Sequence, residues 1–151
     1  MNTRPEVFSC RQLAAGVEED LRPVAEERSV TVNFLVPDMV MAFADKAMIR
    51  IVLRSLLSLA VRGSREGDVI TIFSGQKDGL ITFGIKDHGS EDLREKLNAL
   101  QTASPADSGA EGQGLGLALC RDLVRANGGD LYVETIPGEG NTCYLTLPEP
   151  R

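Results

Sequence analysis

The sequence predicts an α/β protein of the two-layer α+β sandwich type, with a mixed, largely antiparallel sheet and helices on one face. Three observations support this fold class. The chain has 151 residues, enough for one domain with one substantial core. Segments with the apolar spacing of amphipathic helices are interspersed with short strand-like runs of alternating branched and polar residues. Strand-like runs in the second half of the chain are joined in pairs by glycine-containing turns.

Bulk composition excludes two classes of protein. Apolar residues make up 42% of the chain and charged residues 25%, which is ordinary for a soluble globular domain. No stretch approaches the roughly 20 apolar residues that cross a bilayer, and the first residues do not resemble a signal peptide. We therefore expect a cytoplasmic chain without direct membrane contact. The formal net charge of −6 argues against a nucleic-acid partner.

The cysteines and the histidine do not predict a disulfide framework or a metal centre. Cys10, Cys120 and Cys143 are odd in number, and no two have a C-x-x-C spacing. We expect all three to be reduced and mostly buried. His88 is the single histidine of the sequence, which excludes a histidine-rich metal site.

The first helix is predicted from Cys10 to about Glu27, with Ser9 as its N-cap. Its core-facing residues are Leu13, Val17, Leu21 and Val24. Pro23 is expected to kink or divide it, because proline lacks the backbone N–H that a helix interior uses.

Two strands and the most apolar helix come next. Residues 30–35 and 39–44 have the alternation of strands, separated by a Pro37–Asp38 turn. Asp45 then begins a helix that runs to about Arg62. Its apolar stripe predicts a core-facing position and consists of Ile49, Val52, Leu53, Leu56, Leu57 and Ala60.

A hairpin and a long polar stretch follow. The hairpin joins strands at 68–74 and 80–87 through a turn at 75–79. Residues 88–113 are mostly polar, with one short helical segment expected at 91–100. A connection of this length is typical of a functional loop or lid, or else of a disordered segment.

The chain closes with a helix and a second hairpin. The helix is predicted from Leu115 to about Asn127, ended by two glycines, and strands at 130–135 and 142–147 follow, joined by residues 137–141. We therefore expect one domain over 9–148 with a lid at about 88–113, an N-terminal tail or linker at 1–8 and a short tail at 149–151.

The most informative segment is the glycine-rich turn Gly112–Leu117, which runs directly into a helix. Glycines let a ligand approach the backbone amides closely, and the first turn of a helix carries unpaired N–H groups that suit a phosphate. The segment is not the dinucleotide fingerprint, because Leu117 stands where G-x-G-x-x-G needs glycine. A P-loop is excluded too, since no G-K-[ST] ends the turn.

Two further segments are candidates for a ligand site. Asp87 ends a strand, where its carboxylate can accept a hydrogen bond from an exocyclic amine, and Gly89 leaves room for a flat base. Ser55, Leu59 and Arg62 share one face of the apolar helix, beside the core stripe. Taken alone, each of these two segments is more typical of an ordinary strand-ending turn or helix surface.

In this order, the segments resemble the ATP-binding catalytic domain of sensor histidine kinases, with the Bergerat (GHKL) fold shared with gyrase-type ATPases. The resemblance extends from about residue 8 to residue 148. Residues 112–117 match the second glycine box G-x-G-L-G-L, 126–131 resemble A-H-G-G-x-[IL], and 138–148 resemble G-x-G-T…L-P. Residues 87–89 fall where the first glycine box begins.

The resemblance implies ATP or ADP as the ligand, a lid between the glycine boxes, and a role for each matching residue. Asp87 would read the adenine amine beside Gly89, and Arg62 would contact phosphate. The residues that would form the phosphate turn are Gly112, Gly114, Leu115, Gly116 and Leu117.

This sequence departs from the family at the helix motif N-L-L-x-N-A-x-[KR]. The second asparagine, which supplies an oxygen to Mg²⁺, is Leu59 here, and the first is Ser55. A leucine has no oxygen to offer, so we assign no metal ligand and no catalytic residue to these positions. Glu91 also replaces the last glycine of the first glycine box.

The expected function is phosphoryl transfer from ATP to a histidine on a separate dimerisation domain, with a response regulator as a further partner. The chain would then be a cytoplasmic domain, such as one of a membrane-bound sensor. One alternative is a pseudokinase that binds nucleotide, or none, and acts as a regulatory or scaffolding domain. Another is an anti-sigma-type serine kinase of the same fold. A dehydrogenase fits least, because the glycine spacing and the strand order are wrong.

Overall fold

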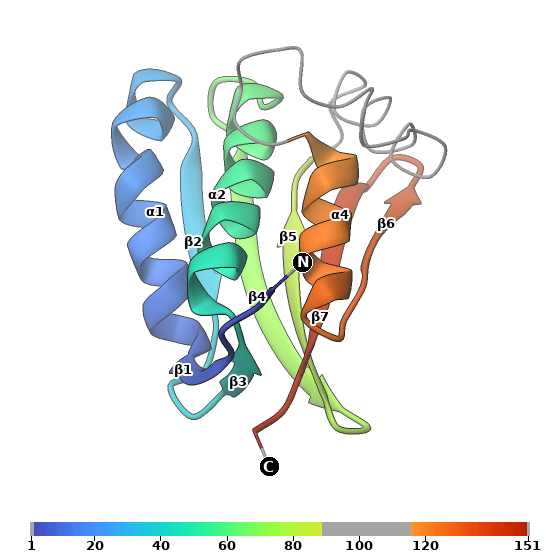
Figure 1. Cartoon of the computed structure of the whole chain (residues 1–151). Coiled ribbons are helices and arrows are strands. Elements are labelled where there is room, and N and C mark those ends of the chain that lie inside the picture. Colours follow the sequence, from blue (N-terminus) through green and yellow to red (C-terminus); the bar gives the residue numbers. More distant parts are fainter. Residues whose placement is uncertain (1, 89–115, 151) are drawn as a thin grey trace.

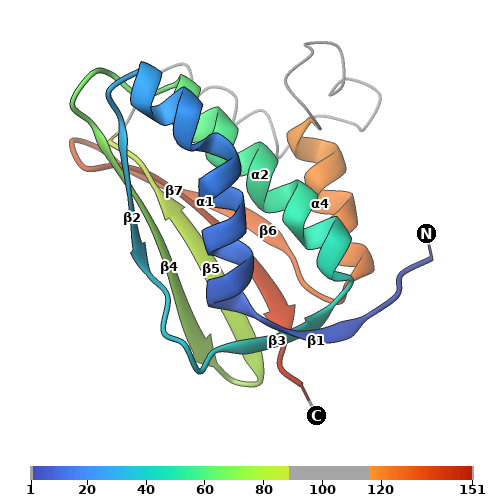
Figure 2. The ribbon, with the colours of Figure 1, turned by 90° about the vertical axis from the view of Figure 1, so that its left-hand side faces the viewer.

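The computed structural model describes residues 2–88 and 116–150. Its main sheet has the strand order β2-β4-β5-β7-β6, and its helices cover one face of that sheet while the other face is open (Figures 1 and 2). The elements in chain order are β1 (Glu6–Ser9), α1 (Cys10–Glu27), β2 (Thr31–Leu35), β3 (Met41–Ala44), α2 (Lys46–Arg62), β4 (Val69–Lys77), β5 (Leu80–Lys86), α4 (Leu117–Ala126), β6 (Leu131–Ile136) and β7 (Gly140–Pro148). The predicted two-layer fold with a mixed sheet is confirmed.

The main sheet is antiparallel except at one edge. Strand β2 pairs with β4 in parallel, whereas β4–β5, β5–β7 and β6–β7 are antiparallel. The β4–β5 turn is shorter than predicted, because β4 continues to Lys77 and only Asp78 and Gly79 connect the strands. Both residues have positive φ, at 55° and 80°. An Asp-Gly pair is the usual sequence of such a two-residue turn, so the prediction of a 75–79 turn was wrong.

Helix α1 begins where its cap predicts. The hydroxyl of Ser9 accepts a hydrogen bond from the backbone N–H of Gln12 at 3.2 Å. The helix continues through Pro23 to Glu27, so the expected division does not occur. Pro23 is exposed, whereas Leu21 and Ala25 beside it are buried. The apolar face thus packs continuously past the proline.

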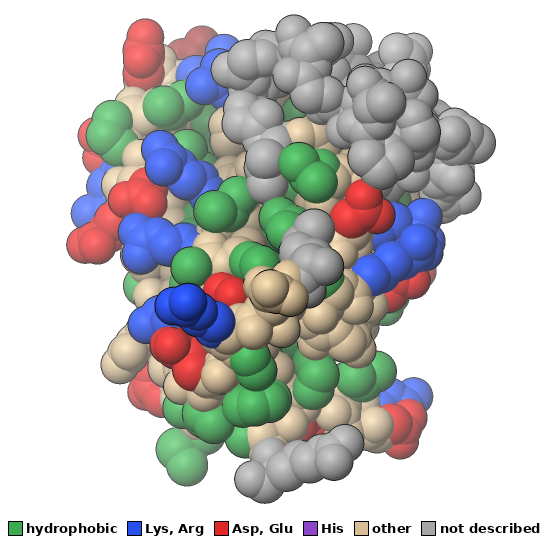
Figure 3. All heavy atoms as spheres, viewed as in Figure 1, with side chains coloured by type: hydrophobic (Ala, Val, Ile, Leu, Met, Phe, Trp, Pro, Cys, Tyr) green, Lys and Arg blue, Asp and Glu red, His purple; other side chains and the backbone are tan. Residues whose placement is uncertain are grey.

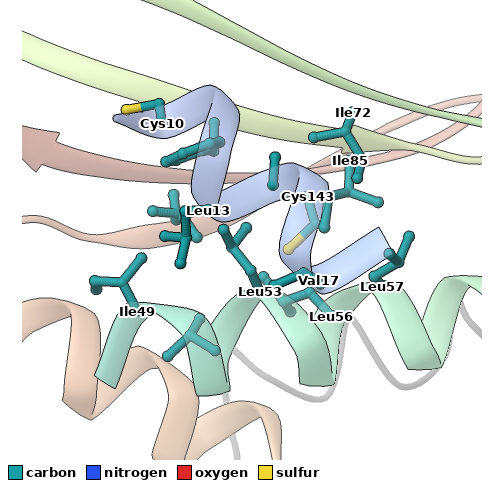
Figure 4. Close-up of a cluster of buried hydrophobic side chains, with 14 of the residues drawn as sticks. Cys10, Leu13, Val17, Ile49, Leu53, Leu56, Leu57, Ile72, Ile85 and Cys143 are labelled. Atoms are coloured by element: carbon teal, nitrogen blue, oxygen red, sulfur yellow. The ribbon is translucent and has the colours of Figure 1, made fainter. Parts of the chain in front are cut away.

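The core lies between the helices and the covered face of the sheet. Every residue of the stripe predicted for α2 is buried, and α1 contributes Leu13 and Val17 to the same cluster. Figure 4 shows Leu53, Leu56 and Leu57 of α2 and Val17 of α1 in one cluster of buried side chains with Ile72 and Ile85 of the sheet. The helical periodicity therefore identified the packed faces of both helices correctly.

The N-terminal segment belongs to the fold. Residues 6–8, expected at the end of a tail, form β1 with Ser9, and β1 pairs antiparallel with β3. The backbone N–H of Arg4 also donates to Asp45 Oδ2 at 2.9 Å, next to the start of α2. A strand of four residues is too short to show a clear alternation in the sequence.

The second half of the chain agrees with the prediction within a few residues at each boundary. Helix α4 begins at Leu117 rather than Leu115, and Asn127 is its C-cap. The helix expected at 91–100 lies outside the described residues, as does nearly all of the lid. Among the helices of residues 2–88 and 116–150, none is long and apolar enough to cross a membrane.

Candidate nucleotide site

The elements that carry the predicted site residues meet at one end of the molecule. Figure 1 shows the C-terminal ends of α2 and β5, the N-terminal end of α4 and the β6–β7 turn at this end. Asp87, Arg62, Gly116 and Leu117 therefore belong to the same end of the fold. Four further predicted residues lie outside the described part of the chain, namely Gly89, Gly112, Gly114 and Leu115.

Asp87 follows β5 directly and is almost completely buried, with 3% of its surface exposed. Its backbone N–H donates to the carbonyl of Asn141 on β7 at 2.9 Å. Its carboxylate oxygen Oδ1 accepts from the backbone N–H and from the side-chain Nδ2 of Asn141, both at 3.4 Å. A buried carboxylate is costly unless polar partners compensate it, and the two Asn141 donors supply part of that compensation.

Gly140 allows the close approach of the β6–β7 turn to Asp87. Its φ is +115°, a region that residues with side chains rarely adopt. A Cβ built on Gly140 would overlap the backbone carbonyl oxygen of Asp87. The glycine thus places the start of β7 directly against the residue that follows β5.

The interior next to Asp87 contains two thiols. Cys120 of α4 shares a hydrogen bond with Ser55 of α2, and burial raises the pKa of Cys120 to about 11. Burial also raises the pKa of Cys143 to about 12, with smaller contributions from Cys120 and Asp87. Cys10, Cys120 and Cys143 are all free and buried, as expected. These thiols are neutral, unreactive parts of the core near neutral pH.

The α2 residues at the positions of the family's helix motif offer few oxygen ligands. Ser55 and Leu59 are half-buried, and Leu59 packs against the hydrophobic core. Arg62 is exposed and donates from Nε to the hydroxyl of Ser58 at 3.1 Å. Mg²⁺ takes oxygen ligands, and Leu59 offers an apolar side chain while the Ser55 hydroxyl is engaged with Cys120. These residues therefore do not fit the Mg²⁺ site of the family that the sequence resembles.

The start of α4 faces the same end through its backbone. Gly116 is the N-cap, with φ −66° and ψ 158°, and no described side chain caps this helix. The first N–H groups of a helix have no partner within the helix, and they carry partial positive charge. Leu117 is half-buried and packs against the core, which fixes the first turn of α4 on the sheet layer.

Two residues of this end were not predicted as site residues. Asn141 is 1% exposed, and its Oδ1 accepts a hydrogen bond from the hydroxyl of Thr135 at 2.9 Å. Thr135 and Asn141 are register partners on β6 and β7. The G-x-G spacing before Asn141 signals a close backbone approach, but only the fold identifies Asp87 as the residue approached.

A hollow of about 460 Å³ lies elsewhere, among β1, β3 and the C-terminal ends of α4 and β7. Its walls include the apolar side chains of Pro5, Val7, Phe43 and Pro148. Figure 3 shows hydrophobic side chains on the lower part of the helical face, where β1 and β3 lie. This hollow is at the opposite end from Asp87 and contains none of the predicted site residues.

The chain matches one protein family and is similar in sequence to several sensory kinases. Residues 44–151 match the sequence pattern of the family described as histidine kinase-, DNA gyrase B-, and HSP90-like ATPase. The adaptive-response sensory kinase SasA of Crocosphaera subtropica is 32% identical over 154 residues. The match covers 97% of this chain but only 39% of SasA, so the chain spans less than half the length of this relative.

Solved structures share the fold. The nucleotide-free catalytic domain of histidine kinase ThkA superposes with a TM-score of 0.82 at 21% identity, over 97% of this chain and 99% of that one. ThkA in complex with the response regulator protein TrrA gives a TM-score of 0.76 at 19% identity, over 97% of this chain and 42% of that one. At these identities the likeness supports the two-layer architecture.

Proposed function

The chain belongs to the family of histidine kinase-, DNA gyrase B- and HSP90-like ATPases, and we propose that it is the ATP-binding catalytic domain of a sensor histidine kinase. The observation that carries this proposal is the buried carboxylate of Asp87 at the end of β5. Asp87 accepts a hydrogen bond from the exocyclic amine of adenine in ATP or ADP. A buried acceptor gives strong selection for a base that donates at this point.

The phosphates lie toward the start of α4 in this proposal. The glycines at 112, 114 and 116 bring backbone amides close to phosphate oxygens, and the first turn of α4 supplies N–H groups that no side chain of the described residues caps, together with the positive end of its dipole. Arg62, exposed at the end of α2, adds a positive charge at the same end of the fold.

The reaction proposed is transfer of the γ-phosphate of ATP to a histidine on a separate dimerisation domain, in the cytoplasm. The attacking imidazole nitrogen forms a bond to phosphorus while the bond to the bridging oxygen breaks, and ADP leaves. The chain contributes by positioning and charge stabilisation. A response regulator is the proposed next acceptor, which takes the phosphoryl group from that histidine. The ThkA complex, which contains a response regulator, supports this partner class.

Thermal melts with nucleotide test the binding step. ADP at about 100 times its dissociation constant stabilises a protein by about 2.7 kcal/mol, which shifts the melting temperature by roughly 5–10 °C in a domain of this size. Asp87→Asn keeps the side-chain volume but presents a donor to the adenine amine, so its shift is expected to disappear. Asp38→Asn is the matched control, because the Asp38 side chain is 83% exposed. Absence of any shift in the wild-type chain contradicts the proposal.

A pseudokinase is the second candidate, and the packing of Leu59 against the core favours it. Such a protein binds nucleotide without transferring phosphate. The experiment incubates the chain with γ-labelled ATP, Mg²⁺ and the histidine-bearing domain of a sensor kinase. Acid-labile label on that domain supports the kinase. Label that appears only after Leu59→Asn supports the pseudokinase.

A further inference from the structure

Asp87 is connected to the edge strand of the sheet through one polar side chain. Thr135 of β6 donates its hydroxyl hydrogen to Asn141 Oδ1 at 2.9 Å, and Asn141 Nδ2 donates to Asp87 Oδ1 at 3.4 Å. The hydrogen-bonded series Thr135–Asn141–Asp87 thus runs from a half-buried hydroxyl to a buried carboxylate.

The carboxylate of Asp87 determines which end of the Asn141 amide faces it. An ionised carboxylate only accepts hydrogen bonds, so the NH₂ end of the Asn141 amide must face Asp87. The carbonyl end then faces Thr135, whose hydroxyl is able to donate. The hydroxyl of Thr135 can donate or accept, and here it donates to the amide orientation that Asp87 requires and so helps to hold the amide in place.

The backbone supports the same geometry. Asp87 N–H donates to the carbonyl of Asn141, and the N–H of Asn141 donates back to Asp87 Oδ1. Both contacts to Oδ1 are long at 3.4 Å, whereas N–H···O bonds are usually about 2.9–3.0 Å. The Asn141 amide, which Thr135 contacts, supplies one of these two contacts to Oδ1.

We propose that Asn141, held by Thr135, is a positioning residue. It fixes the orientation of the Asp87 carboxylate, so that the site prefers a purine with an exocyclic amine to a purine with a carbonyl at the same position. This inference rests on the proposed adenine site. Adenine offers an N–H donor from its exocyclic amine, whereas hypoxanthine offers a carbonyl acceptor at the same place. A carboxylate with a fixed orientation accepts a hydrogen bond from the amine of adenine. With hypoxanthine it faces a carbonyl oxygen, which is also an acceptor, so no hydrogen bond forms. A carboxylate that turns freely discriminates less.

The experiment compares ADP with inosine diphosphate by calorimetric titration. The wild-type chain is expected to bind ADP at least about tenfold more tightly than inosine diphosphate, because a site built to accept a hydrogen bond rejects an analogue that lacks the donor. Thr135→Val removes only the hydroxyl, and the ratio of the two affinities is expected to fall about threefold or more. Asn141→Leu removes the side-chain donor to Asp87 as well, and the ratio is expected to fall further.

Two further variants separate positioning from structural damage. Asn141→Thr retains a side-chain donor next to Asp87 and is expected to restore most of the preference. Thr82→Val is the matched control, since Thr82 is half-buried in β5 with its register partners Gly75 and Thr146 on neighbouring strands. It is expected to keep the wild-type ratio. Thermal melts without nucleotide establish that each variant is folded, and Thr135→Val carries the test where Asn141→Leu does not fold.

The outcomes distinguish this inference from the proposed function. A reduced ratio in Thr135→Val with an unchanged ratio in Thr82→Val supports the positioning role. An equal loss of affinity for both nucleotides, or an unchanged ratio in a folded Thr135→Val, overturns it while the adenine site stands. Failure of the wild-type chain to bind either nucleotide overturns the proposed function and this inference together.

Discussion

The side chain of Asn127 joins the end of α4 to the beginning of α2, because its Oδ1 accepts a hydrogen bond from the backbone N–H of Asp45 at 2.7 Å. Its Nδ2 donates to the carbonyl of Leu123 at 2.8 Å within the last turn of α4. Asn127 is 8% exposed and Asp45 is 9% exposed, so both ends of this connection are shielded from water. One amide thus stabilises the C-terminus of one helix and the N-terminus of another.

Replacement of Asn127 by alanine is therefore expected to destabilise the domain by about 2–3 kcal/mol, since it leaves buried backbone groups without their partner. Urea denaturation measures this through the midpoint at constant slope. Asn33→Ala on the exposed side of β2 is the matched control and should change stability by about 0.5 kcal/mol or less. Equal effects of the two substitutions contradict the connecting role.

Asp45 itself predicts a pH dependence. The pKa of its carboxyl is lowered, first by the hydrogen bond from the backbone N–H of Arg4 and then by that from Met48. A lowered pKa in the folded state means that the carboxylate stabilises the fold above its unfolded pKa of about 3.9, and that this contribution is lost as the pH falls through the folded pKa.

Asp45→Asn keeps an N-cap side chain and removes the titration. The urea midpoint of the wild-type chain is expected to fall more steeply between pH 5 and pH 2, about the acid range of Asp, than that of Asp45→Asn. Asp38→Asn controls for the loss of one negative charge, because the Asp38 side chain is 83% exposed. Parallel profiles for wild type and Asp45→Asn show that the helix cap does not titrate with folding.

The helices illustrate what local pattern can predict. Ser9 and Asp45 each precede an apolar periodic segment, and both are N-caps in the structure. Capping and periodicity act over a few residues, so they are visible in sequence. Strand β1 depends on pairing with β3, more than 30 residues away, and its four residues carry no pattern of their own.

The candidate site shows the same division. Asp87 was a candidate because it ends a predicted strand and falls where the resembling family has its first glycine box, and the structure places it directly after β5. Asn141 was not assigned a role, because its contact with Asp87 spans 54 positions and arises only when β7 pairs with β5. The glycine spacing before Asn141 predicts that the backbone approaches another segment closely at this point. Which residue it approaches depends on the register of the sheet.

The open face of the sheet provides a packing prediction. The ring of Phe73 on β4 covers Gly84, its register partner on β5, and a Cβ on Gly84 would overlap the ring. The same ring makes an edge contact with Tyr144, with centroids 6.0 Å apart. Gly84→Ala is expected to destabilise by about 1–3 kcal/mol, because the ring must leave its position.

A double-mutant cycle isolates this cause. In a Phe73→Ala background the ring is gone, so adding Gly84→Ala should cost clearly less, and the two changes should couple by about 1 kcal/mol or more. Denaturant midpoints of the four chains supply the comparison. Additive effects would show that Gly84 is required for another reason, such as its own backbone conformation.

The last prediction concerns two glycines of the β6–β7 turn. Gly138 and Gly140 both have positive φ, at 81° and 115°, but their surroundings differ. Nothing lies within 4 Å of a Cβ on Gly138, whereas a Cβ on Gly140 would overlap the carbonyl oxygen of Asp87. Alanine at Gly138 therefore incurs only the backbone cost of a left-handed conformation, about 1 kcal/mol.

Alanine at Gly140 adds an overlap between its Cβ and the backbone of Asp87, which turning a side chain cannot relieve. We expect a loss of about 3 kcal/mol or more in the free energy of unfolding, measured in urea. Because the displaced group is Asp87, the melting-temperature shift with ADP should also shrink in Gly140→Ala and persist in Gly138→Ala. If both variants lose stability equally and retain the full ADP shift, the approach of Gly140 to Asp87 neither limits folding nor sets the base-reading carboxylate.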